Sequence, residues 1–297
     1  TQGIDAWAAW IMRRDRKENT TDHPKEFWNT PLPPTPVDGG TISGSITDLS
    51  GRLNLNDLLL AQRNSETALA QPQTLNTEMY NRLRRLCAVL EIDPELVNAI
   101  ADWIDADLDQ RSPGGAEDIY YMGLEIPYRS ANRPLSDLSE LRLIRGVNDE
   151  IFQKLSPHLA ILPQGTTINV NVASSEVMMA LFDGLDRGSA DALLELRGEE
   201  GYASIEAFSK LDPLAGLELK TDGLVLTSHY FMVNSFVQMG DIQLPHRTLI
   251  HRDKSGIVRT LQRALGAQWQ IPPSSILDPT EGTETEENPT IDLPSAG

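Results

Sequence analysis

The most distinctive chemistry in this 297-residue sequence is a run of acidic side chains between residues 102 and 118. Six carboxylates fall within these seventeen residues: Asp102, Asp105, Asp107, Asp109, Glu117 and Asp118. Arg111 is the one cation within the run. Like charges at this density repel one another unless water screens them or a cation neutralises them. Ca²⁺ suits such a stretch, because it takes about six to eight oxygen ligands from carboxylates, amides and backbone carbonyls.

The spacing within the run favours a cation site over a solvated acidic helix end, although the residues alone leave both interpretations open. Every second residue from Asp105 to Asp109 is acidic, as in calcium loops that follow an unwound helix. The Gly114–Gly115 pair lets the chain reverse sharply, after which Glu117 and Asp118 return two carboxylates to the same neighbourhood. Because the glycine and glutamate positions of an EF-hand are not matched, a calcium site here would be of another type.

Composition limits the classes of partner. The net charge of −18 and the isoelectric point near 4.6 argue against nucleic acid, because binding to phosphate backbones depends on clustered Lys and Arg. The single cysteine, Cys87, lies in an apolar helical context, which predicts a buried core thiol without a disulfide. No stretch approaches about eighteen consecutive apolar residues, so no membrane span is predicted within the sequence.

The first residues predict an amphipathic helix. Its apolar stripe follows the helical spacing i, i+3, i+4, i+7: Ile4, Trp7, Ala8 and Ile11. We expect this stripe to pack against the domain's own sheet and Trp10 to face outward, where it can contact a partner. Since no capping residue precedes the stripe, we also expect a helix whose upstream part is missing, with an ordinary N-terminal helix as the alternative.

The order of predicted elements is helix, β, a long helical insert, β and a tail, which predicts an α+β fold with an antiparallel sheet. A polar, proline-rich loop is predicted over 19–38. Residues 41–48 alternate as a strand, and a second short strand follows the turn at Ser50–Gly51.

The C-terminal part of the chain returns to β. Strands are predicted over 230–239, 247–252 and 257–262, and the turns between them indicate an antiparallel meander. The last residues are rich in Pro, Thr, Glu and Ser, which predicts disorder. The chain is therefore divided into four parts: residues 1–56, the first part of the core; 57–220, an inserted α-helical domain; 221–270, the second part of the core; and 271–297, a disordered acidic tail.

Two segments of the insert, 135–155 and 174–196, share a pattern of helix, glycine turn and helix. Such helix-hairpin-helix-like units often bind DNA through backbone amides and nearby cations. Here acids follow the turn at Gly146, and the second unit carries Glu195. The pattern therefore favours a compact packing module over a nucleic-acid site.

No catalytic constellation stands out, and we predict a protein that is not an enzyme. The five histidines are scattered along the chain: His23, His158, His229, His246 and His251. The sequence has neither the G-x-S-x-G elbow of a serine hydrolase nor a glycine-rich phosphate loop. A hydrolase with a pair of catalytic carboxylates remains the enzyme alternative, because acids are abundant.

Five motifs taken together resemble the K-type minor pseudopilins of type II secretion systems, the general secretion pathway protein K family. They occur in the order and rough spacing of that family: Asp48-Leu-Ser-Gly-Arg-Leu-Asn-Leu-Asn, Asp102-Trp-Ile-Asp-Ala-Asp, Gly115-Ala-Glu-Asp-Ile-Tyr-Tyr, Glu140-Leu-Arg-Leu-Ile-Arg-Gly and Ile168-Asn-Val-Asn-Val-Ala-Ser. Each motif alone is weak, but their shared order is specific. The resemblance covers about residues 1–265.

The resemblance implies a pilin-like helix packed on an antiparallel sheet that a large all-α insertion interrupts. It implies a structural subunit at the pseudopilus tip that assembles with I- and J-type minor pseudopilins and supports protein export. The location implied is the periplasm, with anchorage in the inner membrane through an N-terminal helix that is missing here. The alternative is a calcium-stabilised helical enzyme or a helix-hairpin-helix nucleic-acid module.

The resemblance also implies bound Ca²⁺. The positions that match the family's motifs are Asp105, Asp107, Glu117 and Asp118. Asp109 and Asn132 are further candidate ligands, and Asp109 could equally be a solvated neighbour.

Overall fold

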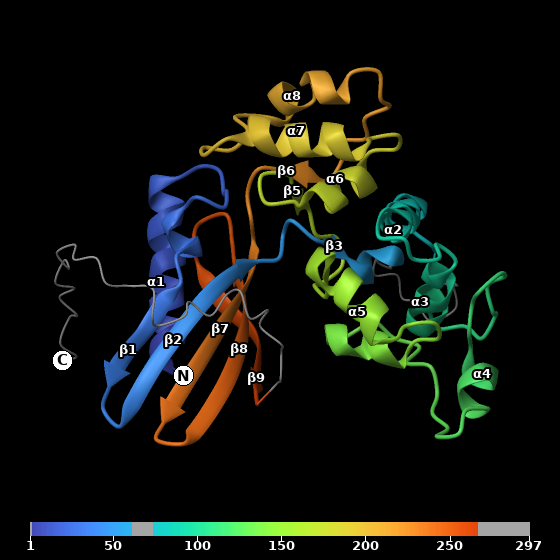
Figure 1. The fold of residues 1–297 in the computed structure, drawn as a ribbon, viewed down its shortest axis with the longest axis horizontal. Coiled ribbons are helices and arrows are strands. Elements are labelled where there is room, and N and C mark those ends of the chain that lie inside the picture. Colours follow the sequence, from blue (N-terminus) through green and yellow to red (C-terminus); the bar gives the residue numbers. More distant parts are fainter. Residues whose placement is uncertain (1, 61–73, 267–297) are drawn as a thin grey trace, which may run out of the picture.

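The computed structural model describes residues 2–60 and 74–266, which form a five-stranded antiparallel sheet, a long helix and a body of short helices (Figure 1). The strand order is β1-β2-β7-β8-β9. The strands have these bounds: β1 (Leu32–Val37), β2 (Gly40–Asp48), β7 (Tyr230–Met239), β8 (Ile242–Arg252) and β9 (Val258–Leu265). β2 and β7 are hydrogen-bonded neighbours, so residues 49–229 are inserted between two paired strands.

Helix α1 (Gln2–Glu18) covers one face of the sheet. The predicted stripe is buried at Ile4, Ala8 and Ile11, where it packs with Phe231 and other sheet residues, while Trp7 is partly buried. Trp10 is 56% exposed, which confirms that it faces away from the core.

One strand was missed, one starts earlier than predicted, and the strand predicted over 257–262 continues to Leu265. Proline is the reason in the first two cases. β1 lies within the segment 19–38 that was predicted to be a loop, because its prolines are tolerated at the edge of a sheet. β8 starts at Ile242 and not at 247, and it passes through Pro245. On the β9 side the last pair in register is His246 with Leu265, and Pro245 needs to supply only its carbonyl there, which accepts from the backbone of Gly266 at 2.9 Å.

The inserted residues form short helices around their own apolar core. The helices are α2 (Thr77–Val89), α3 (Leu96–Ile104), α4 (Asp118–Met122), α5 (Asp149–Leu155), α6 (Ser175–Leu181), α7 (Arg187–Arg197) and α8 (Ile205–Phe208). Short 3₁₀ segments lie at Phe27–Asn29, before β1, and within the insert at Leu55–Leu58, Leu138–Leu143, Ser156–His158 and Asp212–Leu214. Cys87 is buried and free in this core, as predicted, and burial raises the pKa of its thiol to about 12.

The insert is less uniformly helical than its sequence pattern predicts. Two short parallel strand pairs cross it: β3 (Leu53–Asn54) with β4 (Leu159–Ala160), and β5 (Ile168–Asn169) with β6 (Leu224–Val225). The short strand predicted after the turn at Ser50–Gly51 is β3. The two strands of each pair are distant in sequence, so local periodicity does not predict their pairing.

The helix-hairpin-helix-like units are not confirmed. In the first, the segment before Gly146 is a 3₁₀ helix, and only α5 after it is an α-helix. In the second, α6 and α7 flank Gly184, whose φ of 81° fits a glycine turn. This second unit has the predicted order of elements, but nothing in it identifies a nucleic-acid site.

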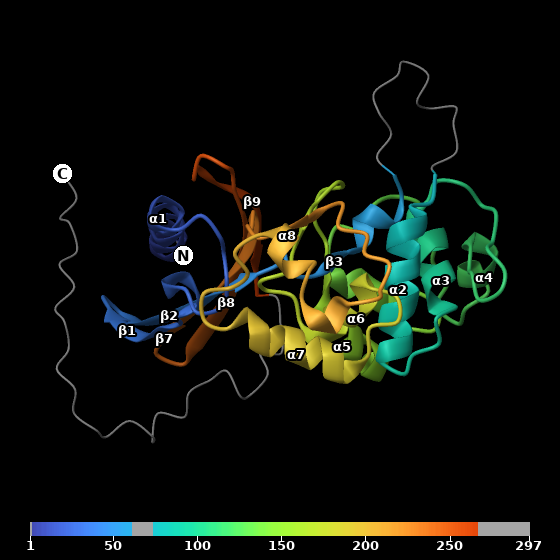
Figure 2. The same cartoon turned by 90° about the horizontal axis from the view of Figure 1, so that it is seen from above.

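The insertion contacts the sheet on the face opposite α1 (Figure 2). Leu49 and Leu249 pack there against Ala160 and Leu162, and an Arg247 nitrogen lies 3.7 Å from Asp137 Oδ2.

The predicted boundaries of the four parts remain predictions, and the tail at 271–297 lies outside the described residues. Within residues 2–60 and 74–266, no helix is both long enough and apolar enough to cross a membrane.

Candidate functional site

The acidic run of residues 102–118 connects α3 to α4. Helix α3 is buried along its length and ends before Asp105, whose backbone is extended (φ −77°, ψ 170°). The chain returns to Glu117, the residue before α4. The rings of Trp103 and Tyr121 meet edge to face with centroids 5.1 Å apart, which fixes the two helices together. This packing brings the two ends of the loop to one place.

Three of the predicted ligands converge there. Asp105, Asp107 and Glu117 each offer a carboxylate oxygen, and these oxygens lie within 4.8 Å of one another. Asp105 is fully buried and Glu117 is 3% exposed. Asp105 Oδ1 and Glu117 Oε1 are buried and accept no hydrogen bond. Since an unpaired buried acceptor is costly, a hard cation bound between these oxygens fits the donor set.

Arg111 offsets only part of this negative charge. Its Nη1 donates to Asp102 Oδ1 at 2.7 Å and also to Asp105 Oδ2, while its backbone N–H donates to Asp102 Oδ2 at 3.1 Å. Asp102 is therefore held by the loop, and its oxygens are not among those that converge. Gly115 is required by this arrangement, because a Cβ there would lie 2.2 Å from Asp102 Oδ2. The ion pairs of Arg111 reach Asp102 and Asp105 but not Asp107 or Glu117.

The pKa values of the converging acids show how unfavourable the unneutralised cluster is. Burial, together with the charges of Asp102, Asp105 and Asp107, raises the pKa of Glu117 to about 7. Burial also raises the pKa of Asp105 to about 6, although Arg111 opposes the shift. Both acids therefore take up a proton near neutral pH when no cation neutralises their charge.

The other three predicted ligands are placed differently. Asp109 is exposed, and its backbone N–H donates to Asp107 Oδ1 at 2.9 Å. Asp118 Oδ1 accepts hydrogen bonds from the backbone and hydroxyl of Ser130, at 3.0 and 2.8 Å. Asn132 Oδ1 is buried without a hydrogen bond, so it is a third unpaired oxygen in this part of the insertion, after Asp105 Oδ1 and Glu117 Oε1. Its backbone N–H donates to Trp103 O at 3.0 Å, which places Asn132 beside the end of α3.

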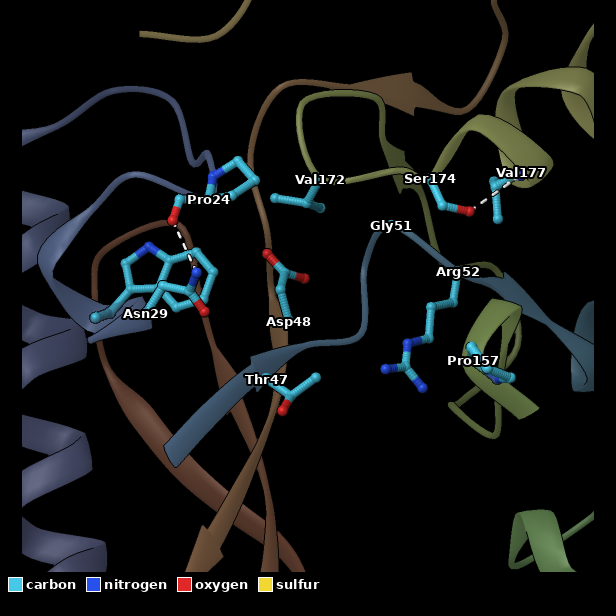
Figure 3. A pocket seen from close by; sticks show the side chains of 11 residues that line it. Pro24, Asn29, Thr47, Asp48, Gly51, Arg52, Pro157, Val172, Ser174 and Val177 are labelled. Carbon is cyan, nitrogen blue, oxygen red and sulfur yellow. Dashed lines mark hydrogen bonds between the residues drawn. The ribbon is translucent and has the colours of Figure 1, made fainter. Parts of the chain in front are cut away.

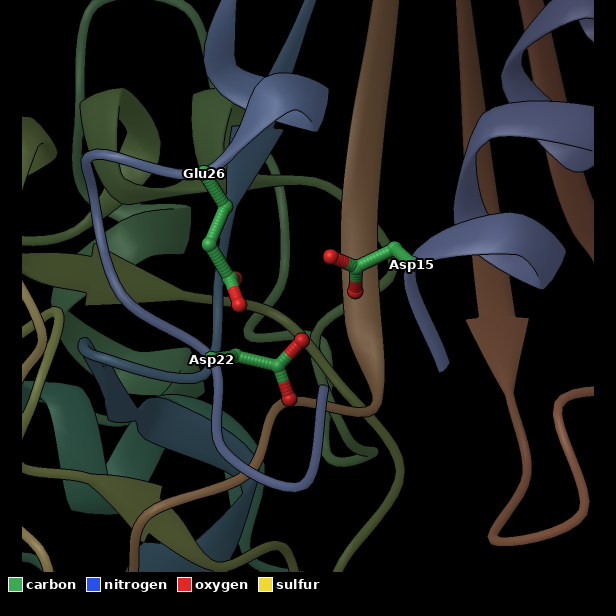
Figure 4. Close-up of side chains that lie close together, drawn as sticks. All are labelled: Asp15, Asp22 and Glu26. Carbon is green, nitrogen blue, oxygen red and sulfur yellow. The ribbon is translucent and has the colours of Figure 1, made fainter. Parts of the chain in front are cut away.

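A second acidic cluster, absent from our predictions, lies where α1 meets the insertion (Figure 4). Asp15 near the end of α1 and Asp22 and Glu26 of the following loop present carboxylate oxygens within 4.8 Å of one another. All three residues are buried.

Arg252, the last residue of β8, neutralises two of these acids. It is 1% exposed, and its Nη1 donates to Asp15 Oδ2 at 2.6 Å while Nη2 donates to Asp22. The guanidinium also lies over the ring of Phe231, 4.9 Å from its centroid. Asp22 Oδ2 accepts from the backbone of Ser228 at 2.8 Å, just before β7. The cluster thus joins α1, the loop after it and two strands of the sheet.

Glu26, the third acid of the cluster, has no cationic partner as close as Arg252 is to Asp15 and Asp22. Its Oε2 accepts from Trp28 Nε1 at 2.6 Å and from the backbone of His23 at 3.1 Å, but its Oε1 is buried without a hydrogen bond. Burial raises the pKa of Glu26 to about 7, and the charges of Asp15 and Asp22 act in the same direction. Because Arg252 and the local donors already hold most of these oxygens, this cluster is better suited to a proton than to a metal ion.

A cavity of about 260 Å³ lies between the end of β2 and the insertion (Figure 3). Asp48 and Arg52 line it from the first chain crossing between sheet and insertion, and Ser174 lines it from the N-terminus of α6. Burial raises the pKa of Asp48 to about 7 and lowers that of Arg52. The cavity therefore lies within the junction of the two parts and is lined by both polar and apolar side chains.

Ser174 does not form a hydrolytic triad. Its hydroxyl lies 3.0 Å from His158 Nδ1, and the nearest acid, Glu176, lies 3.9 Å from the same ring nitrogen. A triad needs the serine and the acid at opposite nitrogens of the ring. Ser174 instead caps α6 by accepting from the backbone of Val177 at 3.3 Å.

Comparison with known proteins points to one family. Residues 51–164 and 168–227 match the family described as type II secretion system (T2SS), protein K. Type II secretion system protein K of Pseudomonas aeruginosa is 34% identical over 276 residues, which cover 89% of this chain and 79% of that protein. The protein of the same name from Pectobacterium carotovorum subsp. carotovorum is 30% identical over 279 residues, covering 91% and 84% of the two chains.

A solved structure has the same architecture. A chain in the crystal structure of the GspK–GspI–GspJ complex from the enterotoxigenic Escherichia coli type 2 secretion system matches with a TM-score of 0.75 and 25% identity. The match covers 90% of this chain and 94% of that chain, so it includes both the sheet and the insertion.

Proposed function

The chain belongs to the protein K family of the type II secretion system, and we propose that it is a minor pseudopilin that caps the tip of the secretion pseudopilus. One observation carries this proposal: residues 49–229 form a large body inserted between two paired strands of a helix-and-sheet core. We further propose that the chain assembles there with I- and J-type minor pseudopilins, as the solved relative does with GspI and GspJ.

The position of the insertion supports a terminal place in a fibre. It packs on the sheet face opposite α1, through Leu49, Leu249 and their neighbours, and broadens the subunit beyond its helix (Figure 2). Pilin-like subunits associate through their helices, so a subunit this broad would clash with a further subunit stacked on it. Such a subunit ends the fibre.

The outer face of α1 supports helix-to-helix association with the partners. Trp10 is 56% exposed there, and the guanidinium of Arg14 lies 5.7 Å from its ring centroid. Large aromatic side chains are frequent anchors of protein interfaces. The role proposed for the chain is therefore contact between proteins in the periplasm, in support of export, and not catalysis.

Calcium is the proposed ion of the acidic loop. Asp105, Asp107 and Glu117 would hold it directly, and Asn132 would supply an amide oxygen. Asp109 and Asp118 would serve only after their side chains turn from the positions described above. The ion would neutralise the acids that Arg111 does not reach and would tie the end of α3 to the start of α4.

Co-purification tests the proposed assembly. We expect the chain to elute with the I- and J-type minor pseudopilins of the same gene cluster as one complex in size-exclusion chromatography. The complex should persist in sedimentation at micromolar concentration. Separate migration of all three proteins, each shown to be folded by circular dichroism, would contradict the proposal.

A further inference from the structure

The C-terminal half of α1 carries several cations, although the whole chain has a net charge of −18. Arg13 and Lys17 are exposed on this helix, and Arg16 is partly buried. Arg16 extends to the turn between β8 and β9, where its Nε donates to Lys254 O at 3.3 Å. Lys254 is itself exposed. We call these four residues the basic band: Arg13, Arg16, Lys17 and Lys254.

The acidic side chains near the basic band are already engaged. Glu18 pairs with Arg14 at 2.9 Å. Asp15 is buried and pairs with Arg252 at 2.6 Å. Asp253, in the turn between β8 and β9, accepts hydrogen bonds from its neighbours in the chain. Among the residues that the structure describes, no member of the basic band forms an ion pair with an acid.

The dipole of the helix accounts for only part of this charge. Arg16 and Lys17 lie in the last turn of α1, where cations interact favourably with the dipole. Arg13 lies one turn earlier and Lys254 belongs to another element, so the dipole does not explain their positions. The two elements together form a cationic surface that is complementary to a concentrated negative charge.

Residues 267–297 of the same chain carry such a charge. They contain six Asp and Glu residues and no Lys or Arg, and five of the six acids fall within 278–287. We call residues 278–287 the acidic segment. It follows β9 in the sequence, and β9 lies beside α1, since Arg263 of β9 pairs with Asp5 of α1 at 2.9 Å.

The acidic segment is within reach of the basic band. Asp5 and Arg16 are eleven residues apart on α1, which corresponds to about 17 Å at the helical rise of about 1.5 Å per residue. Gly266 and Asp278 are twelve residues apart in the sequence, and a chain of that length spans up to about 40 Å. The connection is therefore long enough to bring the acids to the basic band while the sheet stays as it is.

The covalent connection favours the chain's own acidic segment over other anionic partners. A group tethered within this reach has an effective concentration on the order of millimolar. A second copy of the chain or an anionic lipid surface has no such advantage, and each is repelled by the net charge of −18.

We propose that the acidic segment docks on the basic band of its own chain, with its carboxylates beside Arg13, Lys17 and Lys254. The contact neutralises cations that the described residues leave unpaired. It also ties the part of the chain beyond β9 to the end of α1 that adjoins the insertion. The inference goes beyond the proposed assembly and does not depend on it.

Carbodiimide coupling of the full chain tests the proposal. The reagent joins a carboxylate directly to a lysine amine without a spacer, so a product reports contact between the two groups. Lys17 and Lys254 should couple to the acidic segment, whereas Lys210, an exposed lysine of the insertion, is the internal control. Peptide mass spectrometry measures the yields. We expect yields at Lys17 and Lys254 about fivefold or more above the yield at Lys210 at low ionic strength. They should decrease at roughly 0.5 M salt, which screens exposed charges.

Two charge reversals separate docking from general attraction. Arg13→Glu changes the basic band, and Lys210→Glu makes the same change of charge on the insertion. Both positions are exposed, and circular dichroism with thermal melts checks that both variants fold. The yield at Lys254 should fall about threefold or more in R13E and stay nearly unchanged in K210E.

Three outcomes would overturn the proposal. The first is a yield at Lys17 and Lys254 no higher than at Lys210, or an equal yield at Lys254 in the two variants. The second is coupling found only in dimers on a denaturing gel, because a second copy would then supply the acids. The third is binding to phosphatidylglycerol vesicles that R13E abolishes, without coupling inside one chain, which would assign the basic band to a membrane surface.

Discussion

Arg252 Nη1 lies 2.6 Å from Asp15 Oδ2, a buried ion pair that ties the end of β8 to the last turns of α1. The same guanidinium pairs with Asp22 of the loop that follows α1. Because a buried charge is tolerated only when it is paired, this arginine fixes the helix at the end of the sheet that adjoins the insertion. The position of α1 at this end of the sheet therefore depends in part on one side chain of β8.

Replacing Arg252 tests that dependence. Arg252→Met should lower the free energy of unfolding by about 3–5 kcal/mol, because two buried carboxylates lose their cation. Urea denaturation measures the loss. Arg259→Met, which changes an exposed arginine on β9, is the matched control and should cost under about 0.5 kcal/mol. Equal effects of the two variants would show that the buried pairs do not hold the fold together.

Glu26 should make stability depend on pH. Its pKa is about 7 in the folded chain against an ordinary value of 4.5, so between these values the folded chain holds a proton that the unfolded chain has lost. The contribution is full below pH 4.5 and is lost as the pH rises through about 7. The decrease in unfolding free energy from this group is about 3 kcal/mol at most.

The variant Glu26→Gln isolates this effect from other acids with raised pKa values, such as Glu117 and Asp48. Between pH 5 and pH 8 the free energy of unfolding should fall less in the variant than in the wild type. The measurement uses urea denaturation at constant ionic strength. Parallel curves would mean that Glu26 is ionised in the folded chain across this range.

The sequence predicts those parts of the fold that have a local signal. The stripe of α1 and the alternation of β7 are repeated over several turns or residues, so their burial follows from spacing. β1 was missed because its prolines indicate a loop unless the strand is known to be an edge. Strand order comes from pairing over long range, and no local pattern contains it.

The two acidic clusters show that the geometry of a site, like the strand order, depends on contacts between distant parts of the sequence. The loop acids are neighbours in sequence, which made Asp105, Asp107 and Glu117 predictable as a group. Which of the six carboxylates converge depends on the path of the returning chain, so Asp118 could not be separated from them in advance, although Asp109 was already predicted as a possible solvated neighbour. Arg252 lies 230 residues from Asp22, and their pairing depends on the register of β8.

Calcium should stabilise the wild-type chain and not variants of the converging acids. We expect millimolar calcium to raise the melting temperature relative to chelator, because the ion binds only the folded loop. Asp105→Asn or Glu117→Gln should abolish most of this rise, whereas Asp109→Asn, an exposed acid of the same loop, should retain it. Scanning calorimetry provides the measurement. Superimposable wild-type melts with calcium and with chelator would exclude the site.

Protons should compete with calcium at this loop. Glu117 and Asp105, with pKa values of about 7 and 6, are protonated as the pH falls, and only the ionised carboxylates bind the ion. Calcium affinity should therefore fall roughly tenfold per pH unit between pH 7 and pH 6, as measured by isothermal titration. A constant affinity over this range would mean that these acids are not ligands.

Trp10 should anchor a partner without supporting the fold. Its side chain is 56% exposed, whereas Ile4, Ala8 and Ile11 of the same helix are buried against the sheet. Trp10→Ala should weaken binding to the I- and J-type partners by about 1–3 kcal/mol and leave the melting temperature nearly unchanged. Leu196→Ala is the matched control, because Leu196 is also 56% exposed but lies on α7 of the insertion. Sedimentation of each variant with the partner pair measures the effect. If W10A binds normally and L196A does not, the partners contact the insertion and not the outer face of α1.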